Sequence, residues 1–213
     1  MMYLTSQTNG HVFDLDDGTA MAARLLYDML HTYKIFPLDA ININYDQQNQ
    51  LYMDDKLMFM RQWPFFQSVA EGNTAWYSPD KVAIALPPAG PAGPGSWWGG
   101  WGFTVPALAP NPDGAKELIK YITSVEVAPK LAQGQSWFIM PRASILAAMP
   151  DNVLVQAMGM YDAAGAIKPR PYHPRAAEAQ VALEDALSLY FTKQASLYEA
   201  IQIGKELIAA LGE

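Results

Sequence analysis

The side chains best suited to chemistry in this sequence are aromatic and cationic. Trp63 follows closely after Arg61 and comes just before Phe65, whereas Trp101 lies between two glycines. An indole stacks against the patch of C–H bonds on one face of a sugar ring, and glycines let a ligand approach the backbone closely. Arg170 lies between two prolines, and a guanidinium donates paired hydrogen bonds to adjacent hydroxyl oxygens. These residue types suit an aromatic-lined cleft, whose ligand the residue types alone leave open.

The same side chains also fit purely structural roles. Trp63 and Trp101 could fill a core, and Trp97 and Trp98 are better explained by packing within their own loop. Arg170 is as easily a solvated surface cation as a ligand-binding group. The candidate site residues are therefore hypotheses that structural packing could also explain.

Patterns that would indicate catalysis or metal binding are weak. The three histidines are far apart, so no zinc site is expected, and the stretch 95–99 lacks the spacing of a nucleophile elbow. The stretch 99–102 matches neither a P-loop nor a dinucleotide fingerprint. Adjacent carboxylates on a predicted helix, such as Glu184 and Asp185, point in different directions and are interpreted as solvated faces rather than a glycosidase pair. We expect no enzyme, no metal and no cofactor.

Composition describes a globular, acidic chain. Of the 213 residues, 51% are apolar and 16% are charged, which excludes a disordered tail. The formal net charge of −7 opposes binding to nucleic acid or to anionic lipid by charge alone. The absence of cysteine excludes disulfides and thiolate chemistry.

Helical periodicity and capping residues predict most of the regular structure. An amphipathic helix is expected from Thr19 to just before Pro37, and a second over 46–56. After residue 174 the chain is predicted to be helical to its end. Three residue pairs carry helix-start signals, namely Asn111 with Pro112, Thr123 with Glu126, and Ser196 with Glu199.

Short apolar runs predict buried strands at 57–60, 82–86 and about 102–108, and the glycine- and proline-rich stretch 87–102 is expected to be irregular. Strands that alternate with helices predict an α/β fold. No apolar run reaches the roughly 20 residues that a bilayer crossing needs, and the first residues do not resemble a signal peptide.

The order of motifs along the chain resembles the C-terminal half of the family 1 extracellular solute-binding proteins of ABC sugar importers, of the trehalose/maltose-binding type. The similarity is extended, and each motif alone is weak. The segments that carry it are NGHVFDLDDG, HTYKIFPLDA, DDKLMFMRQWPFF, KVAIALPPAGPAGPGSWWGGWGFTV, NPDGAKELIKYITSVEVAPKLA and KPRPYHPRAAEAQVALEDAL.

This resemblance implies the C-terminal lobe of a two-lobed periplasmic-binding-protein fold of type II, which is helix-rich α/β and holds its ligand between hinged lobes. Residues 1–100 would form a first segment of that lobe. Residues 101–123 would be a strand and helix that cross to the N-terminal lobe, and residues 124–213 would be mostly C-terminal-lobe helices. The family's N-terminal half is expected to be absent from this sequence.

The resemblance also implies ligand-binding roles for particular residues. The tryptophan of the family's W-P-Y/F motif and the aromatic residue that follows it correspond to Trp63 and Phe65, where phenylalanine replaces tyrosine and removes one hydroxyl. The family's G-G-W-G turn corresponds to Gly100 and Trp101, and its R-P-x-x-P loop to Arg170. Arg61 and Trp98 are additional candidates.

The implied function is binding of a di- or oligosaccharide for ABC permease subunits, in the periplasm or outside the cell, in a lipid-anchored or soluble form. Two alternatives remain open. The chain could be a truncated remnant that associates with another copy or with a complementing N-terminal half and binds little sugar, because an exposed apolar surface needs a partner. A carbohydrate-active enzyme is the third possibility.

Overall fold

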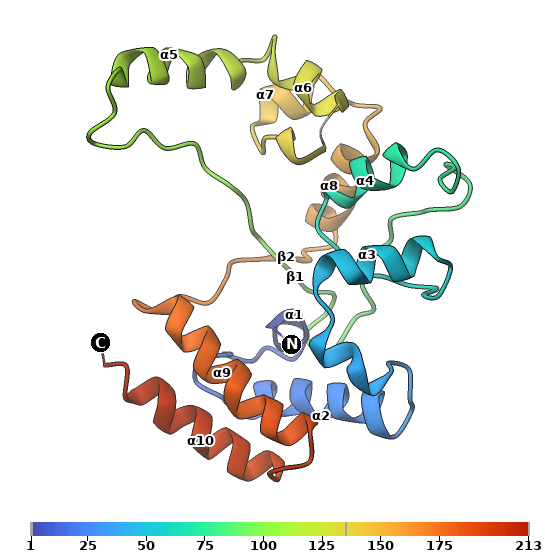
Figure 1. Cartoon of the computed structure of the whole chain (residues 1–213), viewed down its shortest axis with the longest axis vertical. Coiled ribbons are helices and arrows are strands. Elements are labelled where there is room, and N and C mark those ends of the chain that lie inside the picture. Colours follow the sequence, from blue (N-terminus) through green and yellow to red (C-terminus); the bar gives the residue numbers. More distant parts are fainter. Residues whose placement is uncertain (1, 135, 213) are drawn as a thin grey trace. The chain divides into compact units, whose positions relative to one another are not determined.

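The structure is a computed structural model that describes residues 2–134 and 136–212 (Figure 1). It divides into two compact units. Unit 1 contains residues 1–42, 86–99 and 161–213, and unit 2 contains residues 43–85 and 100–160. Both units are therefore built from separate stretches of the chain.

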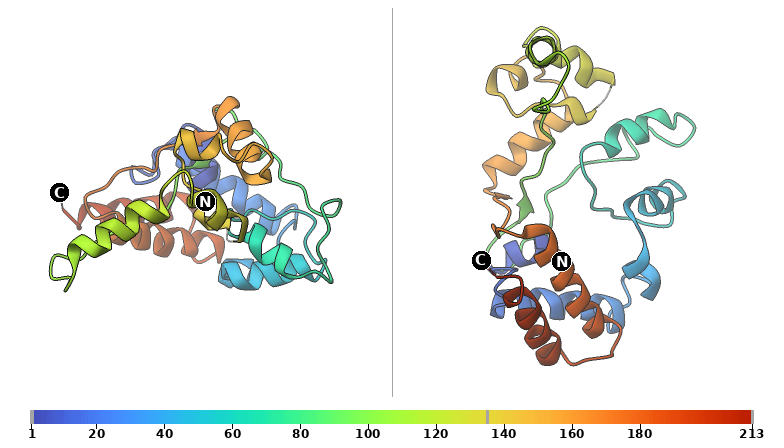
Figure 2. Two further views of the ribbon diagram at one scale, coloured as in Figure 1. Left: turned by 90° about the horizontal axis from the view of Figure 1, so that it is seen from above. Right: turned by 60° about the vertical axis from the view of Figure 1, so that its left-hand side comes forward.

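Unit 1 is a group of helices with one short strand pair. Its elements are α1 (Met2–Gln7), α2 (Asp17–His31), the 3-10 helix η1 (Leu38–Asn42), β1 (Ser96–Trp97), β2 (Ile167–Lys168), α9 (Ala176–Phe191) and α10 (Leu197–Ala209). Helices α9 and α10 pack side by side, and α2 contacts both of them (Figures 1 and 2). The strands β1 and β2 pair in parallel, with Ser96 opposite Ile167.

Unit 2 consists of short helices joined by long irregular segments. Its elements are α3 (Tyr45–Met53), α4 (Phe66–Gly72), α5 (Pro112–Ile122), α6 (Ala128–Gly134), the 3-10 helix η2 (Ser136–Phe138), α7 (Ala143–Leu146) and most of α8 (Val153–Ala163). A small cluster that includes Ala128, Ala132, Ile145 and Met149 forms its core between α6, α7 and the turn after α7.

The core of unit 1 forms where the loop between α1 and α2 packs against α9 and α10. Leu183 and Leu187 on α9 and Ile208 on α10 are buried together with Val12 and Leu15. The helical region predicted after residue 174 is confirmed by α9 and α10. Capping is confirmed as well, because the Ser196 hydroxyl accepts the N–H of Glu199 and the Glu199 carboxylate accepts the N–H of Ser196.

Helix α2 begins three residues earlier than predicted, because its N-cap is Asp16. The Asp16 carboxylate accepts the N–H of His11 at 2.8 Å, and both the N–H and the hydroxyl of Thr19 at 2.9 Å. Partial burial acts to raise the pKa of Asp16, but these hydrogen bonds outweigh it and leave the pKa below its usual value of 3.8. Asp16 therefore ties the preceding loop to the first turn of the helix.

Asp16→Ala is expected to lower the free energy of unfolding by about 1 kcal/mol at pH 7, because a helix cap of this kind contributes that amount. Since the pKa of Asp16 is lowered by folding, its ionised form contributes stability above the unfolded value of 3.8 that is lost as the pH falls below it. Urea unfolding at pH 7 and pH 3 measures both effects. An equal loss on mutation at the two pH values would contradict the assigned role of the charge.

The predicted strands at 57–60, 82–86 and 102–108 are wrong, because none of these segments forms a ladder. Met58 and Phe59 are 82% and 86% exposed, so the first of them is not buried either. The predicted helix start at Thr123 is also wrong. Thr123 ends α5, and its hydroxyl donates to the Ile119 carbonyl at 2.7 Å. The start predicted at Asn111 with Pro112 is confirmed, and α3 matches the helix predicted over 46–56 to within a few residues.

Candidate functional site

An aromatic surface lies on unit 2, and we define it by Tyr45, Trp63 and Phe65. The rings of Tyr45 and Phe65 meet edge to face, with centroids 5.9 Å apart and an interplanar angle of 79°. Trp63 is 49% exposed and Tyr45 is 58% exposed. These exposures argue against a core-filling role for Trp63 and leave part of each side chain accessible to solvent.

Helix α3 holds the backbone of this surface. Gln48 donates from Nε2 to the Arg61 carbonyl at 2.7 Å, and Gln62 donates from Nε2 to the Asn49 side-chain oxygen at 2.7 Å. A capping box at Asn44 fixes the first turn of α3. The segment that carries Trp63 is thus positioned by side chains from a regular helix, although it forms no strand itself.

A pair of serines holds the other end of the same segment. Ser136 is 5% exposed, and its hydroxyl donates to the Pro64 carbonyl at 3.0 Å. The Ser68 hydroxyl on α4 donates to the Ser136 hydroxyl at 2.7 Å and also accepts the N–H of Ser136 at 2.7 Å. The turn between Trp63 and α4 is therefore tied to η2.

Ser136→Ala is expected to destabilise unit 2 by about 1 kcal/mol, because the mutation removes one buried hydroxyl and its hydrogen bonds. Ser68→Ala is the matched control, because it breaks the serine pair but leaves Ser136 free to donate to Pro64. Thermal unfolding followed by circular dichroism compares the two variants. A smaller loss for Ser136→Ala than for Ser68→Ala would show that the Pro64 contact contributes little.

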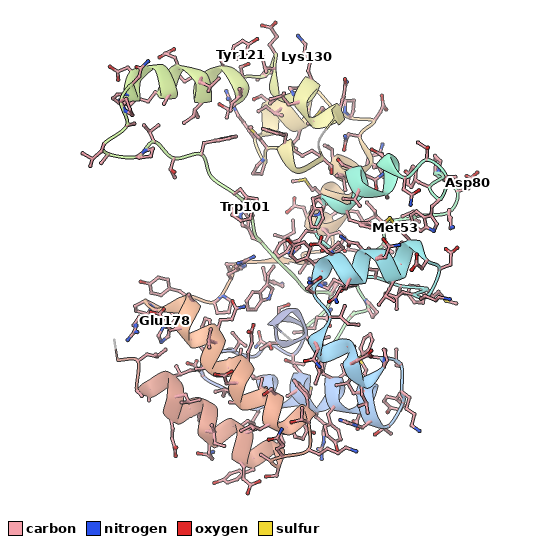
Figure 3. All side chains as sticks on the ribbon, in the orientation of Figure 1. Met53, Asp80, Trp101, Tyr121, Lys130 and Glu178 are labelled. Atoms are coloured by element: carbon pink, nitrogen blue, oxygen red, sulfur yellow. The ribbon has the colours of Figure 1, made fainter. Side chains whose placement is uncertain are left out.

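Gly100 and Trp101 begin the extended stretch of unit 2 that leads to α5 (Figure 3). Trp101 is 95% exposed, so it is not a core residue. A methyl group added at Gly100 would meet no atom within 4 Å, so the space beside its backbone is open. Both features are compatible with the predicted contact to a ligand.

Arg170 and Trp98 are brought together on unit 1. The strand pair β1–β2 places residues 72 apart in sequence side by side, and the Arg170 Nε donates to the Trp98 carbonyl at 3.1 Å. Trp98 is 57% exposed and Arg170 is exposed, whereas Trp97 packs against the core of unit 1. The indole N–H of Trp97 is buried without a hydrogen-bond acceptor from the described part of the protein.

The structure therefore places the predicted site residues in three local groups, one of which is Gly100 with Trp101 on the stretch before α5. Trp63 and Phe65 lie together on unit 2 beside the exposed Arg61, and Trp98 and Arg170 lie together on unit 1. Sequence reasoning missed Tyr45, which joins the aromatic surface from the first turn of α3. Its signal is modest, namely an aromatic residue directly after a helix cap.

Chemistry other than binding has little support in the described residues. Within 2–134 and 136–212 there is no group of three or more His, Asp or Glu side chains that could hold a metal ion. No helix in the same residues is long and apolar enough to span a membrane. What the arrangement offers is aromatic faces, a guanidinium and open backbone.

This fold is that of a solute-binding protein. The maltose-bound MalE3 of T. maritima superposes with a TM-score of 0.77 and 22% sequence identity, over 99% of this chain and 56% of that chain. The described residues are helix-rich, and their match to 56% of that chain is consistent with the partial lobe that the sequence predicts.

Residues 2–129 match the family of bacterial extracellular solute-binding proteins, and the chain belongs to that family. A protein of Deinococcus radiodurans named "Probable ABC transporter-binding protein" is 32% identical over 80 residues, which are 37% of this chain and 19% of the relative. The chain therefore matches about half the length of its solved neighbour and a smaller part of that relative.

Proposed function

We propose that this chain contributes carbohydrate binding to the solute-binding component of an ABC importer, in the periplasm or outside the cell. The observation that carries the proposal is the exposed aromatic surface, because Trp63 is 49% and Tyr45 is 58% exposed on a backbone that α3 holds in place. The proposal is also supported by the similarity to maltose-bound MalE3 and to a protein named as ABC transporter-binding.

The proposed ligand-binding residues are Trp63, Phe65, Gly100, Trp101 and Arg170, with Arg61 and Trp98 as additional members. Stacking on an indole face selects for the apolar face of a sugar ring. On unit 1, the Arg170 guanidinium is a suitable donor of hydrogen bonds to sugar hydroxyls. Phe65 offers no hydroxyl, and Tyr45 at its edge brings one to the same surface. Binding without chemical change requires no metal, nucleophile or general base.

Isothermal titration calorimetry with maltose, trehalose, sucrose and glucose tests the proposal. We expect weak but saturable binding of at least one disaccharide, and no release of glucose from labelled oligosaccharide during incubation. If titration with each of the four sugars gave no heat and no change in tryptophan fluorescence, carbohydrate binding would be contradicted. Turnover of the oligosaccharide would indicate an enzyme instead.

Self-association is a second candidate role, and helix α5 favours it. Its Ala115, Leu118, Ile119 and Ile122 share one face, yet no residue of α5 is buried and Leu118 is 59% exposed. An apolar helix face is normally covered, either by another copy or by a complementing N-terminal half. Sedimentation velocity over a wide concentration range tests association, and a monomer throughout would contradict it.

A further inference from the structure

The side chain of Gln62 connects helix α3 to the backbone of Trp63. Its Nε2 donates to the Asn49 Oδ1 at 2.7 Å and, at the longer distance of 3.4 Å, to the Tyr45 carbonyl. Its Oε1 accepts the N–H of Trp63 at 2.9 Å. Both ends of the carboxamide are thus engaged, and the donor and acceptor pattern fixes which way the amide faces.

The helix end of this connection is well anchored. Asn49 is a polar residue that is only 4% exposed, and its side-chain oxygen gains its hydrogen bond from Gln62. One turn earlier, the Asn44 side chain accepts the N–H of Gln47 at 2.9 Å, and the Gln47 side-chain oxygen accepts the N–H of Asn44 at 3.0 Å. Gln62 therefore connects the Trp63 peptide to a capped helix and not to another loop.

The loop end of the connection has no strand ladder to hold it. Residues 56–63 contain no helix and no strand, so the direction of the Trp63 peptide depends on local hydrogen bonds. The Trp63 side chain is half-exposed. A flat ring binds a sugar face well only when its plane is correctly directed, and an orientation error weakens the stacking.

We propose that Gln62 is a positioning residue for the aromatic surface: by bridging Asn49 and the Trp63 N–H, it sets the direction in which the Trp63 indole meets a sugar ring, without contacting the sugar itself. This inference rests on the proposed carbohydrate-binding function. It adds a residue whose effect on affinity is transmitted through Trp63.

Gln62→Met removes all three hydrogen bonds at nearly constant side-chain length. We expect the sugar dissociation constant to rise about fivefold, the factor that corresponds to the loss of one net hydrogen bond of about 1 kcal/mol. Gln50→Met is the matched control, since Gln50 lies on the same helix and donates from Nε2 to the Asp54 carboxylate at 2.7 Å. The control is expected to bind sugar like the wild type.

Two further variants separate positioning from stability. Asn49→Leu combined with Gln62→Met replaces both polar partners, which avoids a buried unpaired oxygen, so the melting temperature should recover while sugar affinity stays low. Gln62→Glu retains an acceptor for the Trp63 N–H, and the Asn49 amide can turn to donate to it. We therefore expect Gln62→Glu to restore most of the affinity.

A spectroscopic readout works without any ligand. The near-ultraviolet circular dichroism of Trp63 is obtained as the difference between each protein and its Trp63→Phe counterpart. We expect this difference spectrum to change in Gln62→Met and to be preserved in Gln50→Met and Gln62→Glu. An unchanged Trp63 spectrum in Gln62→Met would overturn the inference, whether or not sugar binds.

The outcomes also separate the inference from the function on which it rests. Failure of the wild-type protein to bind any of the four sugars overturns the proposed function, and the spectrum still decides the orientation of Trp63. Loss of binding in Trp63→Ala with wild-type affinity in Gln62→Met overturns the positioning role alone. Equal weakening by Gln50→Met and Gln62→Met would also overturn it, because the loss of any side-chain hydrogen bond of α3 would then suffice.

Discussion

Leu15→Ala is expected to lower the free energy of unfolding of unit 1 by about 3 kcal/mol, within the range measured for leucine truncations in protein cores. Leu15 is 1% exposed and belongs to the main core cluster, which it enters from a loop and not from a helix. Its backbone φ of 47° lies in the left-handed region, which packing must stabilise for a leucine. Urea unfolding monitored by far-ultraviolet circular dichroism measures the loss.

Gly204 on α10 provides the companion test. A methyl group added at Gly204 would lie 2.8 Å from Cδ1 of Leu15 and 3.3 Å from the Ala186 Cβ, so Gly204→Ala alone should be destabilising. In the Leu15→Ala background the same methyl group would partly fill the new cavity, and alanine is the better helix former by about 1 kcal/mol. The double variant should therefore be more stable than Leu15→Ala. Additive losses would contradict this packing arrangement.

Local signals explain why much of the helical structure could be predicted from the sequence. The capping box at Ser196 with Glu199 and the Asn111–Pro112 start act within one turn, so short stretches of sequence suffice to recognise them. Thr123 shows the limit of such patterns. The Thr123 hydroxyl donates to the Ile119 carbonyl in the preceding turn. This hydrogen bond competes with N-capping, and Thr123 therefore ends α5 instead of starting a helix.

Strands could not be predicted in the same way, because a ladder needs a partner that lies elsewhere in the sequence. The apolar run that contains Met58 and Phe59 has strand-like composition but forms no ladder, and it is exposed. The strand pair that does form joins Ser96–Trp97 to Ile167–Lys168, and neither segment carries a strong local strand pattern. Only tertiary structure identifies such pairings.

The candidate site residues were proposed from their residue types, whereas the contacts that hold them in place could not be predicted. Trp63, Trp101 and Arg170 stand out in the sequence because their chemistry is specific, and the structure places all three at exposed positions. Tyr45 and Gln62 were missed because their roles arise from contacts between α3 and a loop more than ten residues away. A glutamine in a loop has no sequence signature that distinguishes positioning from solvation.

Trp63→Ala is expected to weaken disaccharide binding at least about tenfold, because removal of a stacked indole forfeits both the buried apolar area and the favourable ring contact. Trp101→Ala should have an effect of similar size, since 95% of that residue is exposed and free to contact a ligand. Tyr198→Ala is the control, because Tyr198 is an exposed aromatic residue, 72% accessible, on α10 of unit 1.

Stability measurements distinguish a lost contact from a lost fold in these variants. Neither Trp63 nor Trp101 belongs to a core cluster of the described residues, so their removal should leave the melting temperature nearly unchanged. A large fall in affinity at constant melting temperature therefore assigns the indoles to the ligand. Wild-type affinity in both variants would mean that the sugar is held by other groups, because binding through exposed ring faces cannot survive their deletion.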